Sequence, residues 1–328
     1  MKVCVYGAGA VGGHVAARLL GAKTAEVSVV ARGAQLEAIR ARGFTLRSGG
    51  QEIRGRPAAA TDDPSTLPPQ DYVFVTLKAH QLPAAAASLE RLLAPQGCAV
   101  FLLNGITWWW RHGLPGTQGP LPLLDPEGAL WNRLRDRTLG CVLYGPVEVV
   151  EPGVIEHIGN NRWLMGEPDG SPSKRLRAAV ELFTASGLGG EAPADLRREV
   201  WRKLYTNAAG NTIAALTRRG VTDIGTTEEL RRIAAGLMRE TLEVAAALGW
   251  DLRTEIDVEQ ASKRHDRNAT SRPSMLQDVL AGRPIEVEAL VGQTQAFARE
   301  AGVPVPHLDI IVPLLRGLDQ SIRARSKA

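Results

Sequence analysis

The sequence has little of what marks a disulfide-bonded, metal-binding or membrane protein. Its three cysteines, Cys4, Cys98 and Cys141, are widely spaced and form no C-x-x-C pattern. This excludes a disulfide framework and a structural zinc site, and no metal is expected. No apolar run approaches the roughly 18–20 residues of a membrane span. Glycines and Arg18 interrupt the apolar N-terminus, so it does not predict a signal peptide. We expect a cytoplasmic protein with no membrane partner.

Excess charge of one sign is also small. The 328 residues carry a formal net charge of +4, far below that of a typical nucleic-acid binder. The excess mildly favours anionic ligands, and no nucleic-acid partner is expected. With 44% apolar and 23% charged residues the composition is that of a globular protein, and the length suggests two domains.

In the first part of the chain, apolar strand-like runs alternate with helix-like stretches. This predicts a parallel sheet covered by helices on both faces. Residues 154–166 alternate more like an antiparallel hairpin, and residues 111–128, rich in Gly and Pro, predict a long surface loop. The strand candidates are residues 2–6, 27–31, 72–77, 99–103 and 139–144.

Long helical periodicity begins near residue 194. It is clearest in Glu228–Leu248, after which Gly249 occupies the position of a C-cap glycine. The sequence therefore predicts an N-terminal Rossmann-type α/β domain with a doubly wound sheet over residues 1–193, and an all-helical domain over residues 194–328. The join is expected near Gly187–Ala194. The apolar helices can bury against the first domain or against a second copy in a homodimer, and the sequence leaves both open.

A glycine pattern, Gly7-x-Gly9-x-x-Gly12, lies between the first strand and the first helix. The first glycine permits a tight turn, the second lets the backbone approach a pyrophosphate, and the third lets helix and strand pack closely. The helix N-terminus offers free N–H groups to that anion. The expected cofactor-binding segment is therefore Gly7, Ala8, Gly9, Ala10, Val11 and Gly12.

The end of the second strand distinguishes between the two dinucleotides. NAD-binding folds usually place Asp or Glu there, to hold the ribose 2′-hydroxyl. Here the strand ends in VVARG with Arg32, and Glu26 precedes the strand. Because a guanidinium suits a 2′-phosphate, we expect NADP(H). The alternative is that Arg32 is a solvated loop charge.

Two polar residues follow later strands. Lys78 comes after the strand 72–77, and Asn104 after the strand 99–103. Since ligands bind outside the carboxyl ends of parallel strands, both are expected to face the cofactor. Alternatively, Lys78 is an ordinary surface lysine and Asn104 belongs to an Asn-Gly turn.

A polar stripe runs along the predicted helix WRKLYTNAAGN. Lys203, Asn207 and Asn211 recur at every fourth position, within a sector of about 80°. Repeated Asn, a poor helix former, is unusual for a solvated face. Two further candidates are Ser274 and Glu286, which follow Pro273 and Pro284 and could instead be residues of helix first turns.

As an ordered set, these stretches resemble ketopantoate reductase (2-dehydropantoate 2-reductase). The resemblance is carried by GAGAVGG, VTLKA, NGI, WRKLYTNAAGN, SMLQD and IEVEALVG, and it extends from residue 1 to about residue 292. It implies NADPH-dependent reduction of the 2-keto group of ketopantoate to pantoate, a step toward pantothenate.

The resemblance also implies residue roles. Lys203 would be the general acid, with Glu286 beside it in the reaction cleft, and Asn207, Asn211 and Ser274 would hold the small 2-keto acid. Lys78, Asn104 and Glu286 would line the cofactor, and Arg32 would meet its 2′-phosphate. The chemistry agrees, because hydride delivery to a ketone develops negative charge on its oxygen, which a lysine can neutralise and protonate.

Three features depart from the family pattern. Thr212 follows Asn211 where the family often has Pro, Val291 stands where it often has Asn, and Trp108–Trp110 follow NGI. The tryptophans could form a loop that docks on the second domain, or a lid that admits a bulkier keto acid. A reductase for another branched 2-keto acid, or an NADP-binding regulatory protein without turnover, therefore stay open as alternatives. The intact lysine, amide and carboxylate set argues against the regulatory protein.

Overall fold

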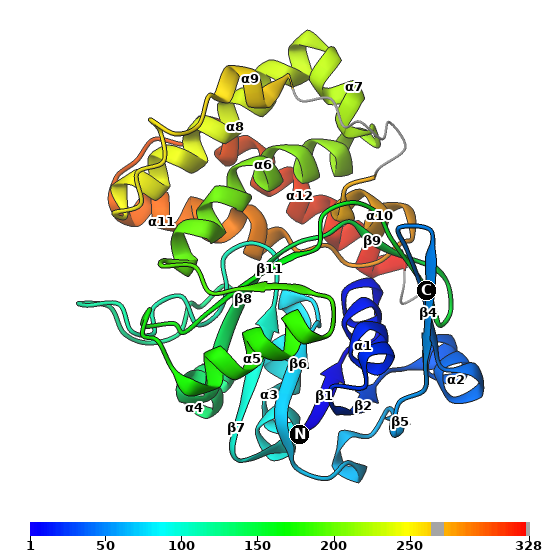
Figure 1. Cartoon of the computed structure of the whole chain (residues 1–328). Coiled ribbons are helices and arrows are strands. Elements are labelled where there is room, and N and C mark those ends of the chain that lie inside the picture. Colours follow the sequence, from blue (N-terminus) through cyan, green and yellow to red (C-terminus); the bar gives the residue numbers. More distant parts are fainter. Residues whose placement is uncertain (264–271, 326–328) are drawn as a thin grey trace. The chain divides into compact units, whose positions relative to one another are not determined.

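The computed structural model describes residues 1–263 and 272–325, which form two compact units (Figure 1). The first unit contains residues 1–103 and 108–196. The second contains Asn104–Thr107 and the chain from Arg197 onward. The expected join, Gly187–Ala194, is not a free linker. It contains the edge strand β12 (Gly189–Glu191), which pairs with β11 (Arg162–Gly166) in the first unit.

An eight-stranded sheet forms the centre of the first unit. All its strand pairs are parallel except β11 with β8, which is antiparallel. Most of its central strands are buried along nearly their whole length, as their continuous apolar runs predict. The Rossmann-type fold class is confirmed. In order across the sheet the strands are β12, β11 (Arg162–Gly166), β8 (Thr138–Tyr144), β7 (Leu93–Leu102), β6 (Gln70–Val75), β1 (Lys2–Tyr6), β2 (Glu26–Val30) and β5 (Ala59–Thr61).

The first unit also has a second sheet, which the sequence did not reveal. Its order is β4 (Gln51–Gly55), β3 (Phe44–Ser48), β10 (Val154–His157) and β9 (Val147–Glu151). Helix α1 (Ala10–Ala22) packs against strands of both sheets. Gly13 permits this, because a Cβ there would lie 2.6 Å from Cδ1 of Ile155 in β10. The other helices of this unit are α2 (Gly33–Arg42), α3 (Leu82–Leu92), α4 (Ala129–Leu134) and α5 (Lys174–Ala185).

The predicted hairpin over residues 154–166 is wrong. Its two halves are β10 and β11, and they belong to different sheets. β10 pairs antiparallel with β9, while β11 pairs antiparallel with β8. The sequence alternation was misleading because β11 lies between two strands of the large sheet and is buried on successive residues, from Trp163 to Gly166.

The three tryptophans are buried, and two of them pack on strands of the first unit. Trp108, Trp109 and Trp110 are almost fully buried. Trp108 packs edge-on against Phe101 of β7, with ring centroids 5.2 Å apart, and the ring of Trp109 lies over Gly140 of β8. Trp108 and Trp109 thus lie against strands of the large sheet, while the docking or lid role expected of this loop stays a prediction.

The predicted surface loop 111–128 is partly buried. Asp125 has no exposed surface, and its carboxylate accepts hydrogen bonds from the backbone N–H groups of Leu130 (3.1 Å) and Trp131 (2.8 Å) at the start of α4. The loop therefore caps a helix, which offsets the cost of burying a carboxylate.

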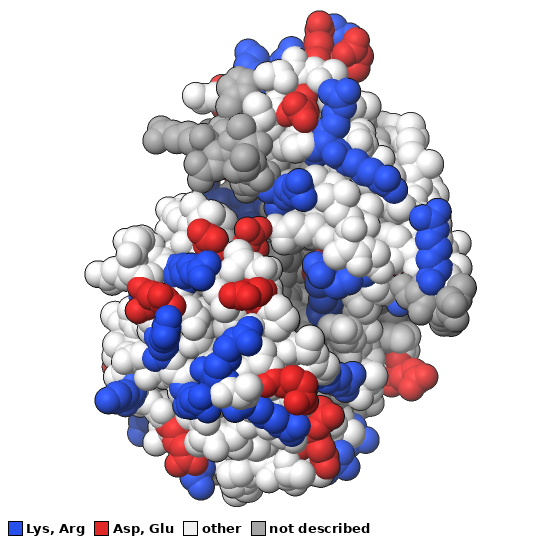
Figure 2. All heavy atoms as spheres, turned by 90° about the vertical axis from the view of Figure 1, so that its right-hand side faces the viewer, with Lys and Arg blue, Asp and Glu red and all other residues white. Residues whose placement is uncertain are grey.

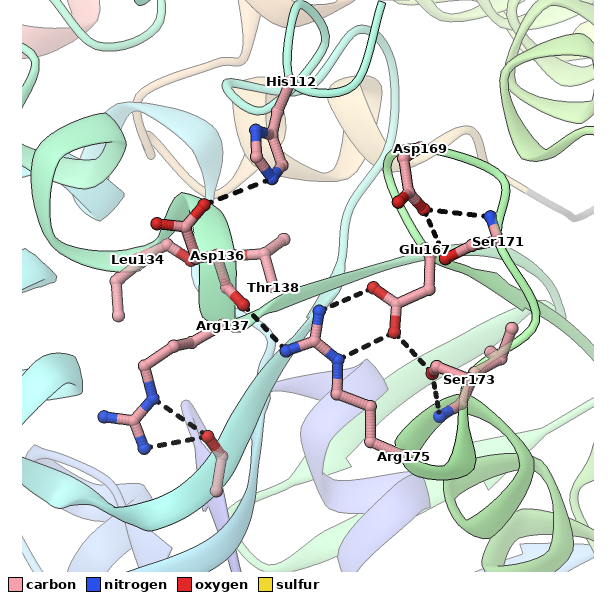
Figure 3. A network of polar contacts seen from close by, with 12 residues as sticks. His112, Leu134, Asp136, Arg137, Thr138, Glu167, Asp169, Ser171, Ser173 and Arg175 are labelled. Carbon is pink, nitrogen blue, oxygen red and sulfur yellow. Dashed lines mark hydrogen bonds and ion pairs between the residues drawn. The ribbon is translucent and has the colours of Figure 1, made fainter.

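A polar network ties together the end of β11, the start of α5 and the approach to β8 (Figure 3). The buried carboxylate of Glu167 accepts two hydrogen bonds from Arg175, of 2.7 and 2.6 Å, and one from Ser173. Arg175 also donates to the carbonyl of Asp136, and Arg137 donates to the carbonyl of Gly97, where the continuously buried part of β7 begins. The network lies at the amino-terminal edge of β7 and β8, the edge opposite to the one where ligands bind.

The described part of the second unit is helical. Gly249 has φ +99° and Trp250 N–H donates to the carbonyl of Ala245, which confirms the C-cap after α8. Glu240 of α8 accepts hydrogen bonds from His307 and from the N–H of Leu308, so it holds the start of the last helix. The helices are α6 (Leu196–Thr217), α7 (Val221–Thr226), α8 (Glu228–Ala247), α9 (Val258–Ser262), α10 (Ser274–Leu280), α11 (Gln293–Ala301) and α12 (Pro306–Arg325).

Two surface properties bear on partners. None of the helices over the described residues combines the length and apolarity needed to cross a bilayer. Figure 2 shows one face of the molecule, and over its lower part Lys and Arg side chains are intermixed with Asp and Glu. Charge of one sign does not gather there.

Candidate active site

The glycine loop has the geometry that a dinucleotide requires. Gly7 has φ +104°, and its N–H donates to the carbonyl of Val30. A Cβ on Gly12 would lie 1.9 Å from the carbonyl oxygen of Gly7, so only glycine fits there. A Cβ on Gly9, in contrast, would meet nothing within 4 Å. The backbone at Gly9 is therefore open at the N-terminus of α1, where a pyrophosphate can approach N–H groups.

Arg32 and Lys78 follow strands that flank this loop. Tyr6, the last residue of β1, is in register with Val30 of β2 and Val75 of β6. The carboxyl ends of these strands therefore form one edge, and the exposed Arg32 comes two residues beyond it. Lys78 comes three residues beyond β6 and is half-buried. Within the loop, Ala8 is buried while Ala10 and Val11 are partly exposed.

Helix α6 aligns the polar stripe as the spacing predicted, because it is continuous from Leu196 to Thr217. Lys203 and Asn207 are half-buried, and Asn211 is buried. The Nζ of Lys203 donates a 2.6 Å hydrogen bond to Oδ1 of Asn104. Both residues belong to the second unit. An uncharged acceptor thus orients the ammonium group without neutralising it.

The Asn104 segment is fixed from its other side by the π-helical turn Glu288–Gly292. The N–H of Ile106 donates to the carbonyl of Ala289 at 2.8 Å. Gly105 has φ +80°, and a Cβ there would lie 2.2 Å from the same carbonyl oxygen. This close approach requires glycine in the Asn-Gly pair. Glu286 lies two residues before this helical turn, so the chain that carries it leads into the turn on which Gly105 and Ile106 pack.

Asn211 and Ser274 are in direct contact. Oδ1 of Asn211 accepts hydrogen bonds from Oγ of Ser274 (3.2 Å) and from the N–H of Met275 (3.1 Å). The side chain of Asn211 therefore holds the start of α10 against α6 and supplies one of its capping acceptors. Because Oδ1 of Asn211 already accepts these two hydrogen bonds, only its NH2 group can fill the substrate-binding role expected of this residue.

Two residues that sequence reasoning missed support the glycine loop. Thr76 Oγ1 donates to the carbonyl of Gly7 at 2.6 Å, and Gln35 Nε2 donates to the carbonyl of Ala8 at 2.6 Å. Thr76 lies within the VTLKA stretch and could have been noticed beside Lys78. No sequence pattern marks Gln35, because its partners are backbone atoms far away in the chain.

A buried histidine lies in the helix that follows the loop. His14 has no exposed surface, and its ring stacks on that of His157 with centroids 4.5 Å apart. Burial above all, with smaller contributions from the nearby His157 and Arg18, lowers the pKa of His14 to about 3. The imidazole is therefore neutral at physiological pH.

Across the described residues, no cluster of His, Cys, Asp and Glu has the composition to hold a metal ion.

Comparison with known proteins gives consistent matches over nearly the whole chain. The family model "Ketopantoate reductase PanE/ApbA" matches residues 3–170, and "Ketopantoate reductase PanE/ApbA C terminal" matches residues 195–319. The 2-dehydropantoate 2-reductase of Mesorhizobium japonicum is 38% identical over 323 residues, covering 97% of this chain and 98% of that protein.

Solved structures agree with these matches. The PanE/ApbA family ketopantoate reductase from Ralstonia eutropha JMP134 superimposes with a TM-score of 0.82 at 25% identity, covering 98% of this chain and 100% of that one. The D-mandelate dehydrogenase bound to NADH and anilino(oxo)acetate has a TM-score of 0.82 at 19% identity, with coverages of 98% and 100%. The second likeness shows the fold alone.

Proposed function

The chain belongs to the ketopantoate reductase family, and we propose that it uses NADPH to reduce the 2-keto group of a small 2-keto acid, best fitted by 2-dehydropantoate. The observation that carries this proposal is the hydrogen bond from Lys203 to Asn104. This hydrogen bond supports the proposal because it orients the amine of Lys203 at Asn104, on a helix whose same face also carries Asn207 and Asn211.

The first unit would hold the cofactor. The open backbone at Gly9 and the N-terminus of α1 fit the pyrophosphate. Arg32, exposed beyond the carboxyl end of β2, would bind the 2′-phosphate, and Lys78 would contribute a second positive charge beyond β6. NADPH, when bound, supplies the hydride for the reduction.

The second unit would hold the keto acid. Asn207 and the NH2 group of Asn211 offer hydrogen bonds from one face of α6, and the hydroxyl of Ser274 lies at the start of α10, in contact with Asn211. Uncharged donors can bind the carboxylate and hydroxyl groups of the substrate in a fixed register, which is the preorganisation that catalysis needs.

Lys203 would then complete the chemistry. As the carbonyl carbon becomes tetrahedral, negative charge develops on its oxygen. The ammonium group stabilises that charge and donates the proton that turns the alkoxide into the hydroxyl of the product. Glu286 would help to orient the lysine or the substrate hydroxyl from the adjoining segment.

A steady-state assay of NADPH oxidation against a panel of 2-keto acids tests the proposal. The panel includes 2-dehydropantoate, smaller branched keto acids and benzoylformate, the keto acid related to mandelate. We expect the highest kcat/KM for 2-dehydropantoate. Preference for another member would redefine the substrate, and no oxidation with any member would favour the NADP-binding regulatory protein.

A further inference from the structure

Gln35 connects the glycine loop to the turn between β9 and β10. It lies in the first turn of α2, three residues after Arg32, and is half-buried. Its Nε2 donates a 2.6 Å hydrogen bond to the carbonyl of Ala8, and its Oε1 accepts a 3.0 Å hydrogen bond from the N–H of Gly153. These residues all belong to the first unit.

Only a primary amide satisfies both of these partners. The carbonyl of Ala8 needs a donor, whereas the N–H of Gly153 needs an acceptor. A glutamate at position 35 could accept from Gly153 but would place a carboxylate oxygen against the carbonyl of Ala8. A methionine would match the length of Gln35 and make neither hydrogen bond.

The hydrogen bond to Ala8 fixes a peptide plane inside the glycine loop. Because a trans peptide is planar, the direction of the Ala8 carbonyl determines that of the Gly9 N–H, which points the opposite way. Gly9 is exposed, and a Cβ there would meet nothing within 4 Å. This peptide therefore borders the open backbone that would receive a pyrophosphate.

We propose that Gln35 is a positioning residue for the cofactor: it holds the Ala8–Gly9 peptide in the orientation that binds the pyrophosphate. The inference rests on the proposed function, since it requires a dinucleotide at the loop. Gln35 acts through the backbone and carries no charge to match a 2′-phosphate. NADPH and NADH share the pyrophosphate. Loss of the Gln35 side chain should therefore weaken the binding of both cofactors by a similar factor, whereas loss of the Arg32 side chain should weaken the binding of NADPH selectively.

The experiment is a fluorescence titration of the full-length protein with NADPH and with NADH. Gln35→Met should raise both dissociation constants by a similar factor, on the order of fivefold to tenfold for two lost hydrogen bonds. Gln35→Glu should raise both dissociation constants at least as much, because its carboxylate would face the carbonyl of Ala8. Arg32→Ala is the comparison variant, and it should weaken NADPH selectively.

Arg42→Met is the matched control. Arg42 donates a 2.6 Å hydrogen bond to the carbonyl of Pro152 in the same turn, but it lies at the opposite end of α2 from Gln35. Its loss should leave both dissociation constants unchanged. Equal weakening by Arg42→Met and Gln35→Met would assign the effect to packing of the turn and contradict the inference.

Other results of the titration would contradict the positioning role of Gln35. Unchanged affinities in both Gln35 variants would overturn the positioning role, and selective loss of NADPH would reassign Gln35 to the 2′-phosphate. A wild-type protein that binds neither cofactor would remove the proposed function itself, which separates that failure from failure of the inference.

Discussion

The Nζ of Lys203 lies 2.6 Å from Oδ1 of Asn104, although the two residues are 99 positions apart in the chain. Asn104 is fixed in turn by its neighbours, because Gly105 and Ile106 pack against the carbonyl of Ala289. The direction of the ammonium group is thus set by a rigid backbone segment rather than by the long lysine side chain alone. A general acid needs this kind of restraint.

If Asn104 acts through Lys203, the two residues are coupled. Lys203→Ala should lower kcat by roughly 10²- to 10⁴-fold. Asn104→Ala should lower kcat in the wild type but add little in the Lys203→Ala background, and a double-mutant cycle measures this difference. Arg202→Met is the control on the same helix, because Arg202 pairs with Glu255 instead. Full additivity of the two losses would show that Asn104 does not act through the lysine.

The contact of Asn211 with α10 predicts two effects, one on the binding of the keto acid and one on stability. Asn211→Ala removes the acceptor for Ser274 and for the N–H of Met275. It should therefore raise KM for the keto acid and also lower Tm, since a capping acceptor contributes about 1 kcal/mol. Ser274→Ala should raise KM with a smaller change in Tm. If Tm fell equally in the two variants and KM was unchanged in both, the contact between Asn211 and Ser274 would be purely structural.

The network in Figure 3 should contribute stability without affecting the reaction. Glu167 is buried and bound by Arg175 and Ser173, so Glu167→Gln should lower the free energy of unfolding by roughly 1–3 kcal/mol. The matched control is Glu191→Gln. Glu191 makes a similar pair with Arg162, but both side chains are about half exposed, so a loss of about 0–1 kcal/mol is expected. Urea denaturation measures both, and equal losses would show that burial does not matter here.

The buried His14 predicts a dependence of stability on pH. In the unfolded chain a histidine binds a proton below its ordinary pKa of 6.5, whereas folded His14 resists protonation until about pH 3. This group therefore lowers the free energy of unfolding as pH falls from 6.5 toward 3, by about 1.4 kcal/mol per unit where only the unfolded state is protonated. His14→Phe should reduce this slope, as measured by urea denaturation at a series of pH values. An unchanged slope in His14→Phe would mean that other groups dominate acid unfolding.

Much of the fold could be predicted because its signals are local. The glycine pattern, the buried apolar runs and the four-residue spacing in α6 each lie within a few residues, and the fold class, the family and the oxidoreductase assignment are confirmed. The family's cofactor, NADP(H), follows from the same matches.

What the sequence did not reveal depends on contacts between distant segments. The second sheet pairs β3 with β10, more than one hundred residues later, so no local alternation predicts it. The expected 154–166 hairpin is wrong for the same reason, because β10 and β11 pair with strands of different sheets. Gln35 was missed because it recognises backbone atoms. The packing of Trp108 and Trp109 on β7 and β8 could not be foreseen, because aromatic side chains in a loop do not show which surface they cover.

The most direct test of the central claim follows the hydride itself. The protein is incubated with 2-dehydropantoate and NADPH carrying deuterium at the transferring position of the nicotinamide, and the product is examined by mass spectrometry. We predict pantoate with one deuterium at C2, and loss of most of this product in the Lys203→Ala variant. Absence of deuterium at C2, or an equal rate in Lys203→Ala, would contradict the proposed reduction with Lys203 as the acid.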